Sequence, residues 1–175
     1  HPDTHVLPLN GSREGLFSAI FPARDRKPEI VRPTVLIPNP FYQVYAAAAA
    51  VAGAAPTFLA STPQAGFLPA LEAIDDAALQ RTVAFYLCSP SNPEGAVASR
   101  DYLKRVIGLA RRHDFLLFAD ECYSEIYTDE PPPGALEVAM EETASLANVV
   151  AFQSLSKRSG LPGLRSGFVA GDPAF

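Results

Sequence analysis

The sequence TVAFYLCSPSNPEG at residues 82–95 contains an uninterrupted apolar run, followed at once by a polar turn rich in Ser, Asn and Pro. The same pattern occurs twice more, as FLLFADECY at residues 115–123 and as VVAFQSLSK at residues 149–157. A continuous apolar run of this length is typical of a strand buried on both faces of a parallel sheet. These three stretches therefore predict the core of an α/β fold.

The segments between the apolar runs predict helices. The clearest begins at Ser99 and ends near Arg112, because its apolar residues recur at helical spacing. We also expect helices at residues 12–20, 41–54, 68–74 and 136–147, and strands at 33–37, 57–60 and 167–170, with a turn at Pro38–Pro40. This alternation predicts a three-layer αβα domain, with a mostly parallel sheet flanked by helices.

The composition narrows the class of protein. The 175 residues are 48% hydrophobic and 19% charged, which is typical of one globular domain with a real core. The formal net charge of -5 argues against a nucleic acid or an anionic membrane as partner. The only two cysteines, Cys88 and Cys122, form neither a disulfide framework nor a zinc pattern, so we expect no metal and a reduced, cytoplasmic protein.

Polar residues directly follow each of the three buried runs. Asn92 follows the first run, Asp120 and Tyr123 follow the second, and Lys157 follows the third. In open α/β sheets, ligands bind beyond the carboxyl ends of the strands. If the strands are parallel, an amide, a carboxylate, a phenol and an amine meet at one edge of the sheet.

This set of groups suits pyridoxal phosphate (PLP). The cofactor needs a lysine amine that condenses with its aldehyde, and a carboxylate that keeps its ring nitrogen protonated. It also needs donors to its ring oxygen and an anion site for its phosphate, which helix N-termini and arginine supply.

The sequence resembles the class I/II aminotransferases of PLP fold type I. The motifs that carry the resemblance are Ser91–Gly95, Asp120–Tyr123, Ser154–Lys157 and Gly163–Gly167, whose order and spacing match along nearly the whole chain. The resemblance implies the fold type I large domain, a PLP cofactor and, in the full-length enzyme, a homodimer.

The resemblance also implies roles for residues around the cofactor ring. Lys157 matches the lysine that binds PLP covalently and moves the proton between the substrate Cα and the cofactor. Asp120 matches the partner of the ring nitrogen, whereas Asn92 and Tyr123 match the donors to the ring oxygen. Tyr42 matches the aromatic residue that stacks on the ring.

A second group of residues matches the phosphate site. Ser154 and Arg165 correspond to phosphate ligands. Gly11, Ser12 and Arg13 correspond to the phosphate-binding turn at a helix N-terminus, where the backbone N–H of Arg13 can matter more than its side chain.

A finer resemblance concerns the segments Pro40–Tyr45 and Ser154–Gly171, which are similar to those of N-succinyldiaminopimelate aminotransferases. Those enzymes of lysine biosynthesis exchange an amino group between N-succinyl-LL-2,6-diaminopimelate and 2-oxoglutarate. Family members are longer than this chain. We therefore expect residues 1–175 to be the PLP-binding large domain, a fragment that lacks the N-terminal segment and the C-terminal small domain with its carboxylate-binding arginine.

Other interpretations remain open at this point. The motifs fit another fold type I enzyme, such as a C–S lyase or a decarboxylase, and also a non-catalytic, aminotransferase-like regulatory domain. Single residues have simpler explanations too. Lys157 could be a surface lysine, Tyr42 could pack in the core, and Arg165 could pair with a surface carboxylate. Asp120, Asn92 and Gly11–Ser12 could serve only turns or a helix start.

Overall fold

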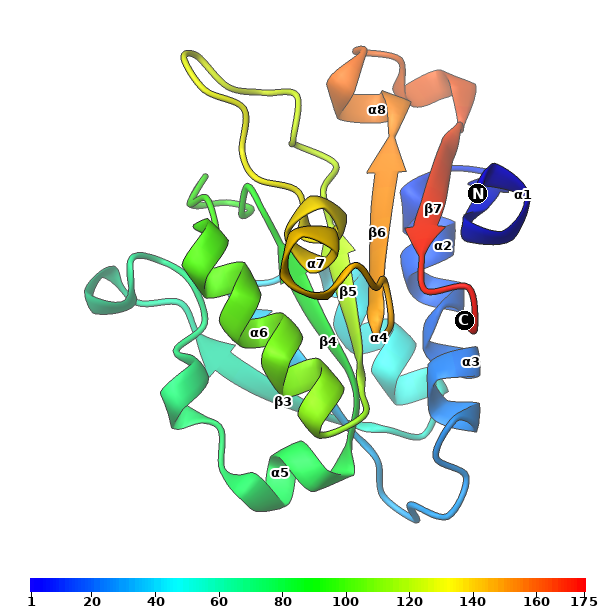
Figure 1. The fold of residues 1–175 in the computed structure, drawn as a ribbon, viewed down its shortest axis with the longest axis vertical. Coiled ribbons are helices and arrows are strands. Elements are labelled where there is room, and N and C mark those ends of the chain that lie inside the picture. The colour runs from blue at the N-terminus through cyan, green and yellow to red at the C-terminus, as the bar shows by residue number, and fades with distance from the viewer.

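The computed structural model describes residues 1–175, which form one seven-stranded sheet in the order β1-β7-β6-β5-β4-β2-β3 (Figure 1). The strands are β1 (Val6–Leu9), β2 (Thr34–Asn39), β3 (Ala55–Ala60), β4 (Thr82–Cys88), β5 (Leu116–Asp120), β6 (Val149–Ser154) and β7 (Gly167–Gly171). Every neighbouring pair from β6 to β3 is parallel, and only β7 runs antiparallel to its neighbours. The predicted, mostly parallel sheet is confirmed.

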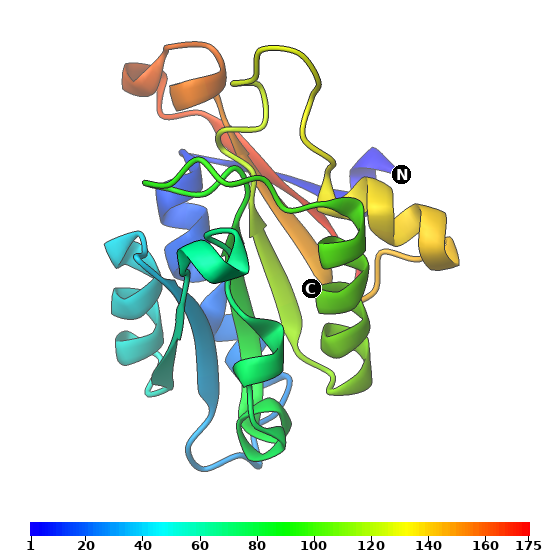
Figure 2. The same cartoon turned by 90° about the vertical axis from the view of Figure 1, so that its left-hand side faces the viewer.

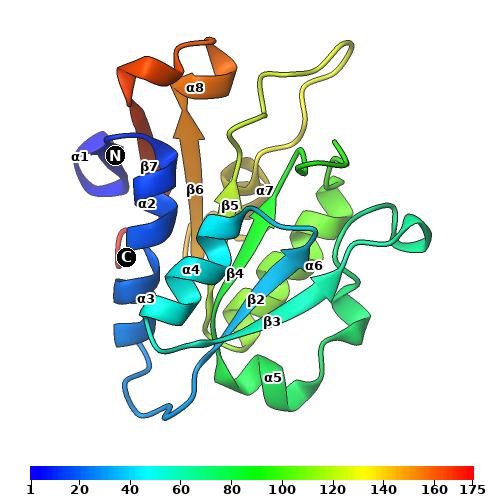
Figure 3. The ribbon, with the colours of Figure 1, turned by 180° about the vertical axis from the view of Figure 1, so that it is seen from behind.

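Helices cover both faces of the sheet. One face carries α2 (Ser12–Ser18), α3 (Ile20–Asp25) and α4 (Gln43–Val51) (Figure 3). The other face carries α5 (Asp76–Arg81), α6 (Arg100–Arg112) and α7 (Ala135–Thr143) (Figure 1). The side view shows the three layers, and α1 (Pro2–His5) and α8 (Leu155–Arg158) are single turns (Figure 2). The αβα prediction is confirmed, and no helix has the length and apolarity needed to cross a membrane.

The three apolar runs form the centre of the sheet. β4 has the predicted bounds with every residue buried, while β5 and β6 agree with the prediction to within one residue at each end. The helix predicted after Ser99 is also confirmed as α6. It begins at Arg100 because the Ser99 hydroxyl accepts a hydrogen bond from the Tyr102 N–H and caps the first turn.

Several predicted boundaries are wrong in the first third of the chain. β2 continues through Pro38, where we expected a turn. This proline is tolerated because β2 pairs with β4 only as far as Leu36, so no N–H is needed on that side. The first helix continues beyond residue 20 as α3. The next one, α4, begins two residues later than predicted, because Tyr42 is extended.

The helix predicted at residues 68–74 is wrong. That segment contains only a 3₁₀ turn, Leu71–Ala73. The true helix, α5, begins at Asp76, because the Asp75 carboxylate caps it by accepting a hydrogen bond from the Ala78 N–H at 2.6 Å. β1 was not predicted either, since its four residues are largely exposed and lack alternation.

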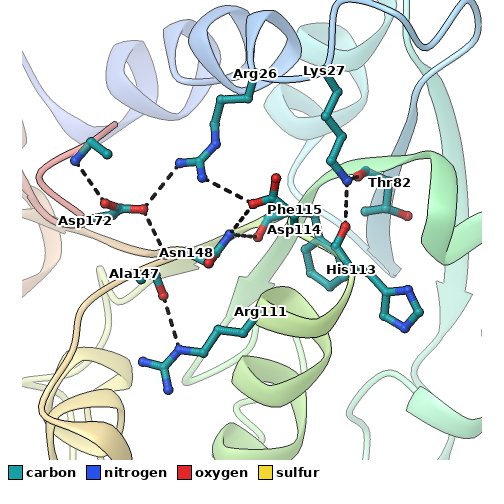
Figure 4. A network of polar contacts seen from close by, with 11 residues as sticks. Arg26, Lys27, Thr82, Arg111, His113, Asp114, Phe115, Ala147, Asn148 and Asp172 are labelled. Carbon is teal, nitrogen blue, oxygen red and sulfur yellow. Dashed lines mark hydrogen bonds and ion pairs between the residues drawn. The ribbon is translucent and has the colours of Figure 1, made fainter.

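A polar network closes the end of the sheet where β4, β5 and β6 begin (Figure 4). Lys27 is only 8% exposed, and its amine donates hydrogen bonds to the carbonyls of Thr82 and His113. Nearby, the Arg26 guanidinium pairs with Asp114 and Asp172, both at 3.3 Å. These contacts join the end of α3 to the strands. They lie at the end of the sheet opposite to the carboxyl ends of the parallel strands.

Candidate active site

A cavity of about 300 Å³ lies at the carboxyl ends of the parallel strands. Every residue predicted for the site lines it except Gly11, which precedes Ser12 directly. The predicted residues on its wall are Ser12, Arg13, Tyr42, Asn92, Asp120, Tyr123, Ser154, Lys157 and Arg165. Strands far apart in sequence thus bring the predicted groups together, as the parallel order implies.

Asp120 lies on the floor of this cavity at the end of β5. It is 4% exposed and takes part in no ion pair. Its two donors are the Tyr45 hydroxyl, at 2.6 Å, and the Cys122 N–H, at 3.3 Å. Burying a carboxylate without a cation is costly. The site therefore holds a buried carboxyl group that has no cationic partner within the protein and lines the cavity.

The groups around Asp120 stay protonated at neutral pH. Burial, together with the charge of Asp120, raises the pKa of the Tyr45 phenol well above its usual value. The same two causes raise the pKa of the Cys88 and Cys122 thiols. All three can therefore donate hydrogen bonds, and none of them adds negative charge to the site at neutral pH.

Lys157 lies on α8, the single turn that follows β6. Its ammonium is 5.8 Å from the centre of the Tyr123 ring, and it forms no ion pair. The turn begins where the buried Ser154 hydroxyl accepts a hydrogen bond from the Ser156 N–H at 3.1 Å. The lysine therefore projects from a capped turn at the cavity wall, with its amine free for a ligand.

Gly11 and Arg165 meet at the start of α2. Gly11 has a φ of +96°, and a Cβ there would overlap the Arg165 guanidinium. The positive φ favours glycine here, and a side chain would push the Arg165 guanidinium away from this helix start. Arg165 also pairs with the Glu14 carboxylate at 2.8 Å, which is the carboxylate partner that the simpler interpretation expected. The α2 N-terminus has no side-chain cap.

The Arg13 side chain points to Tyr42. Its Nε donates a hydrogen bond to the Tyr42 hydroxyl at 2.6 Å, and its guanidinium lies 5.9 Å from the centre of that ring. Tyr42 also packs edge-on against Tyr45, with ring centres 5.7 Å apart. These contacts hold the Tyr42 ring at the cavity wall, in reach of a flat ligand.

Asn92 lies in the loop that follows β4. Backbone hydrogen bonds from Gly95 to Ser91 and from Ser91 to Ala96 close this loop. The Ser89 hydroxyl accepts a further bond from the Ala98 N–H, which anchors the loop to the approach of α6. Asn92 thus lies on a hydrogen-bonded turn that lines the cavity.

Two residues of the site were missed at the sequence level, Tyr45 and Cys122. Tyr45 occurs three residues after Tyr42, a helical spacing within the helix predicted at residues 41–54, although in the structure Tyr42 is the extended N-cap of α4. Cys122 lies between Asp120 and Tyr123, and its thiol is 3.0 Å from the Ser12 hydroxyl. The helical spacing was a signal for Tyr45, whereas no sequence signal links Cys122 to Ser12.

The comparisons with known proteins agree with one another. A family model of aminotransferase class I and II matches residues 1–175. The LL-diaminopimelate aminotransferase of Desulforudis audaxviator is 38% identical over 172 residues, which cover 98% of this chain and 42% of that protein.

Two solved structures are similar along the same residues. An aminotransferase of Neisseria meningitidis has a TM-score of 0.91 with 40% identity, over 99% of this chain and 43% of its own. A Thermus thermophilus protein described as a probable N-succinyldiaminopimelate aminotransferase has a TM-score of 0.86 with 30% identity, over 99% of this chain and 44% of its own. The chain thus spans about two fifths of the length of these relatives.

Proposed function

The chain belongs to the class I and II aminotransferases, and we propose that residues 1–175 are the PLP-binding large domain of a longer, PLP-dependent aminotransferase. Fold, family and cavity all favour this function. The observation that carries it is Asp120, a buried carboxylate without a cation on the cavity floor, with the free amine of Lys157 on the same cavity wall. An aminotransferase cofactor requires both groups.

The residues present fit PLP. A protonated ring nitrogen supplies the cation that Asp120 lacks. The phosphate fits at the start of α2, where Ser12, the turn at Gly11 and the guanidinium of Arg165 would hold an anion. Ser154 lines the same cavity and is a further phosphate ligand in this proposal.

When bound, PLP supplies an aldehyde for amines and an electron-withdrawing ring. In our proposal, Lys157 would hold the cofactor through its amine and, when the substrate amine has taken its place, would accept the proton from the substrate Cα. Asp120 would keep the ring nitrogen protonated. Tyr123 and Asn92 would donate hydrogen bonds to the ring oxygen, and the Tyr42 ring would pack against the cofactor.

We propose that the amino donor is diaminopimelate or a derivative of it. One relative is named an LL-diaminopimelate aminotransferase, and one similar structure is described as a probable N-succinyldiaminopimelate aminotransferase. We propose transfer from N-succinyl-LL-2,6-diaminopimelate to 2-oxoglutarate in lysine biosynthesis, with free LL-diaminopimelate as the alternative donor. The proposed enzyme is a cytoplasmic homodimer whose substrate carboxylate is bound outside residues 1–175.

The first experiment tests cofactor and lysine together. PLP is added to the whole protein, the absorbance spectrum is recorded, and borohydride reduction is followed by peptide mass mapping. We expect a visible band that reduction removes, with the cofactor mass on Lys157. A mass on another lysine, or on none, contradicts the proposal.

A second experiment separates transamination from the lyase and decarboxylase alternatives. The amine form of the cofactor is bound to the whole protein, and 2-oxoglutarate is added. A transaminase regenerates the aldehyde form and releases glutamate, whereas a lyase or a decarboxylase leaves the spectrum unchanged. Each candidate donor is then compared by its kcat/KM.

A further inference from the structure

We propose that Tyr45 is the positioning residue of Asp120, whose carboxylate it fixes in the orientation that a cofactor ring nitrogen needs. This inference rests on the proposed function. The Tyr45 hydroxyl donates to Asp120 Oδ2 at 2.6 Å, across 75 positions of sequence. Tyr45 is 1% exposed, so water does not compete for this bond.

The two oxygens of Asp120 are held unequally. Oδ2 accepts the short bond from the Tyr45 phenol, whereas Oδ1 accepts only the Cys122 N–H at 3.3 Å. A short hydrogen bond to a charged oxygen is among the stronger ones in proteins. Tyr45 therefore determines the plane of the carboxylate, and Oδ1 keeps most of its accepting capacity for a ligand.

Packing holds Tyr45 itself in place. Its ring stacks on the Tyr86 ring, with centres 4.5 Å apart and planes 12° from parallel. The Tyr86 hydroxyl donates in turn to the carbonyl of Leu16 on α2, at 2.7 Å. A chain of contacts thus leads from the middle of α2, through two buried rings, to the carboxylate.

A second connection starts at the first residue of α2. The Ser12 hydroxyl contacts the Cys122 thiol at 3.0 Å, and the Cys122 N–H donates to Asp120. α2 is therefore linked to Asp120 at two points, while its N-terminus is the proposed phosphate site. The helix sets the distance between the group that holds the phosphate and the group that holds the ring nitrogen.

The test is Tyr45→Phe in the whole protein, because this change removes the hydroxyl and keeps the stacked ring. The matched control is Tyr102→Phe, which also removes a phenol hydrogen bond, to the Pro69 carbonyl at 2.9 Å. The four readouts are the ¹⁵N resonance of ring-labelled PLP, the Kd for PLP, the kcat and KM, and a crystal structure of each apo variant.

For Tyr45→Phe we expect the ¹⁵N resonance to move toward that of an unprotonated ring. The Kd for PLP should rise about tenfold, as expected for one hydrogen bond to a charged group. We also expect a lower kcat with little change in KM, and a rotated Asp120 carboxylate in the apo crystal. The Tyr102→Phe control should match the wild type in all four measurements.

An unchanged resonance and an unrotated carboxylate in Tyr45→Phe would overturn the inference, even if activity falls. If the variant does not fold, Tyr86→Phe replaces it. That change keeps the ring stack but frees it from Leu16, so a smaller shift in the same direction is expected and no shift overturns the inference. If the wild type fails to bind PLP, the proposed function fails, and the apo crystals alone decide the role of Tyr45.

Discussion

At the scale of single residues, the environment of each lysine distinguishes Lys157 from the only other two lysines of the chain. Lys27 is buried at the opposite end of the sheet, where it donates to backbone carbonyls. Lys104 lies on the surface of α6 and pairs with Glu142 at 3.0 Å. Only Lys157 lines the cavity with an unpaired amine.

Lys157→Ala should therefore abolish the reducible PLP adduct and lower kcat by at least about a thousandfold, because one residue supplies both the amine and the base. The measurement is the absorbance spectrum together with single-turnover kinetics of the whole protein. Lys104→Ala is the control and should keep both. Substantial turnover in Lys157→Ala would mean that another residue moves the proton.

Gly11 offers a test of the phosphate end. Gly11→Ala should raise the Kd for PLP by about tenfold or more, because its Cβ would displace the Arg165 guanidinium and α2 would begin from a strained φ. The matched control is Gly108→Ala in α6, where a Cβ meets nothing within 4 Å. That change should leave PLP binding intact and add about 0.5–1 kcal/mol of stability. Equal Kd values for the two variants would contradict the phosphate assignment.

At the scale of elements, two adjacent acidic residues at the carboxyl end of β5, Asp120 and Glu121, point in opposite directions. Asp120 points into the cavity, whereas Glu121 accepts hydrogen bonds from the Ala135 N–H at 2.7 Å and from the Gln153 side chain at 3.0 Å. Side chains alternate across a strand, so adjacent residues serve opposite faces. Burial raises the pKa of Glu121, although both hydrogen bonds oppose this shift. Glu121 joins β5 to α7 and β6.

The start of α5 gives an element-level prediction. Asp75→Ala should lower the free energy of unfolding by about 1 kcal/mol, because the cap on the Ala78 N–H is lost. Asp76→Ala, one residue further on, removes an acid from the same turn without removing the cap, and should cost about half as much or less. Urea unfolding of both variants measures the difference. Similar losses would show that charge at the helix start matters more than the cap.

At the scale of the whole molecule, Asp172, directly after β7, is hydrogen-bonded to Asn148 before β6 and to Arg26 at the end of α3 (Figure 4). Partial burial would raise its pKa. Hydrogen bonds from the N–H groups of Asn148 and Ala174 and from Arg26 outweigh that effect and hold the pKa below its usual value. A carboxyl group with a lowered pKa stabilises the fold above its unfolded-state pKa, and this stabilisation is lost as the pH falls through the folded-state value.

Asp172→Asn should therefore lower the free energy of unfolding by about 2 kcal/mol at pH 7, since an amide N–H₂ cannot accept from Arg26. The difference from the wild type should shrink as the pH falls below about 4, where the wild-type carboxyl group itself becomes protonated. Urea unfolding at several pH values is the measurement, and Asp3→Asn on the exposed α1 is the control. A difference that stays constant with pH would contradict the electrostatic explanation.

The sequence by itself determined the central strands, the expectation of a mostly parallel sheet and the residues at the ends of those strands. Buried strands need continuous apolar runs, and their carboxyl ends must meet at one edge, so Asn92, Asp120 and Lys157 could be brought together on paper. Ser99 likewise predicted the start of α6, because a serine before a helix caps it through local contacts alone.

Only the tertiary structure decided the contacts between residues distant in sequence. The hydroxyl of Tyr45 on Asp120, the stack on Tyr86 and the approach of Arg165 to Gly11 each join separate elements. Periodicity reports which face of an element is buried, but not which atom of another element it will meet. Backbone spacing fixes a site's position within the sheet, whereas the orientation of its charged groups depends on side-chain packing, which exists only in the folded chain.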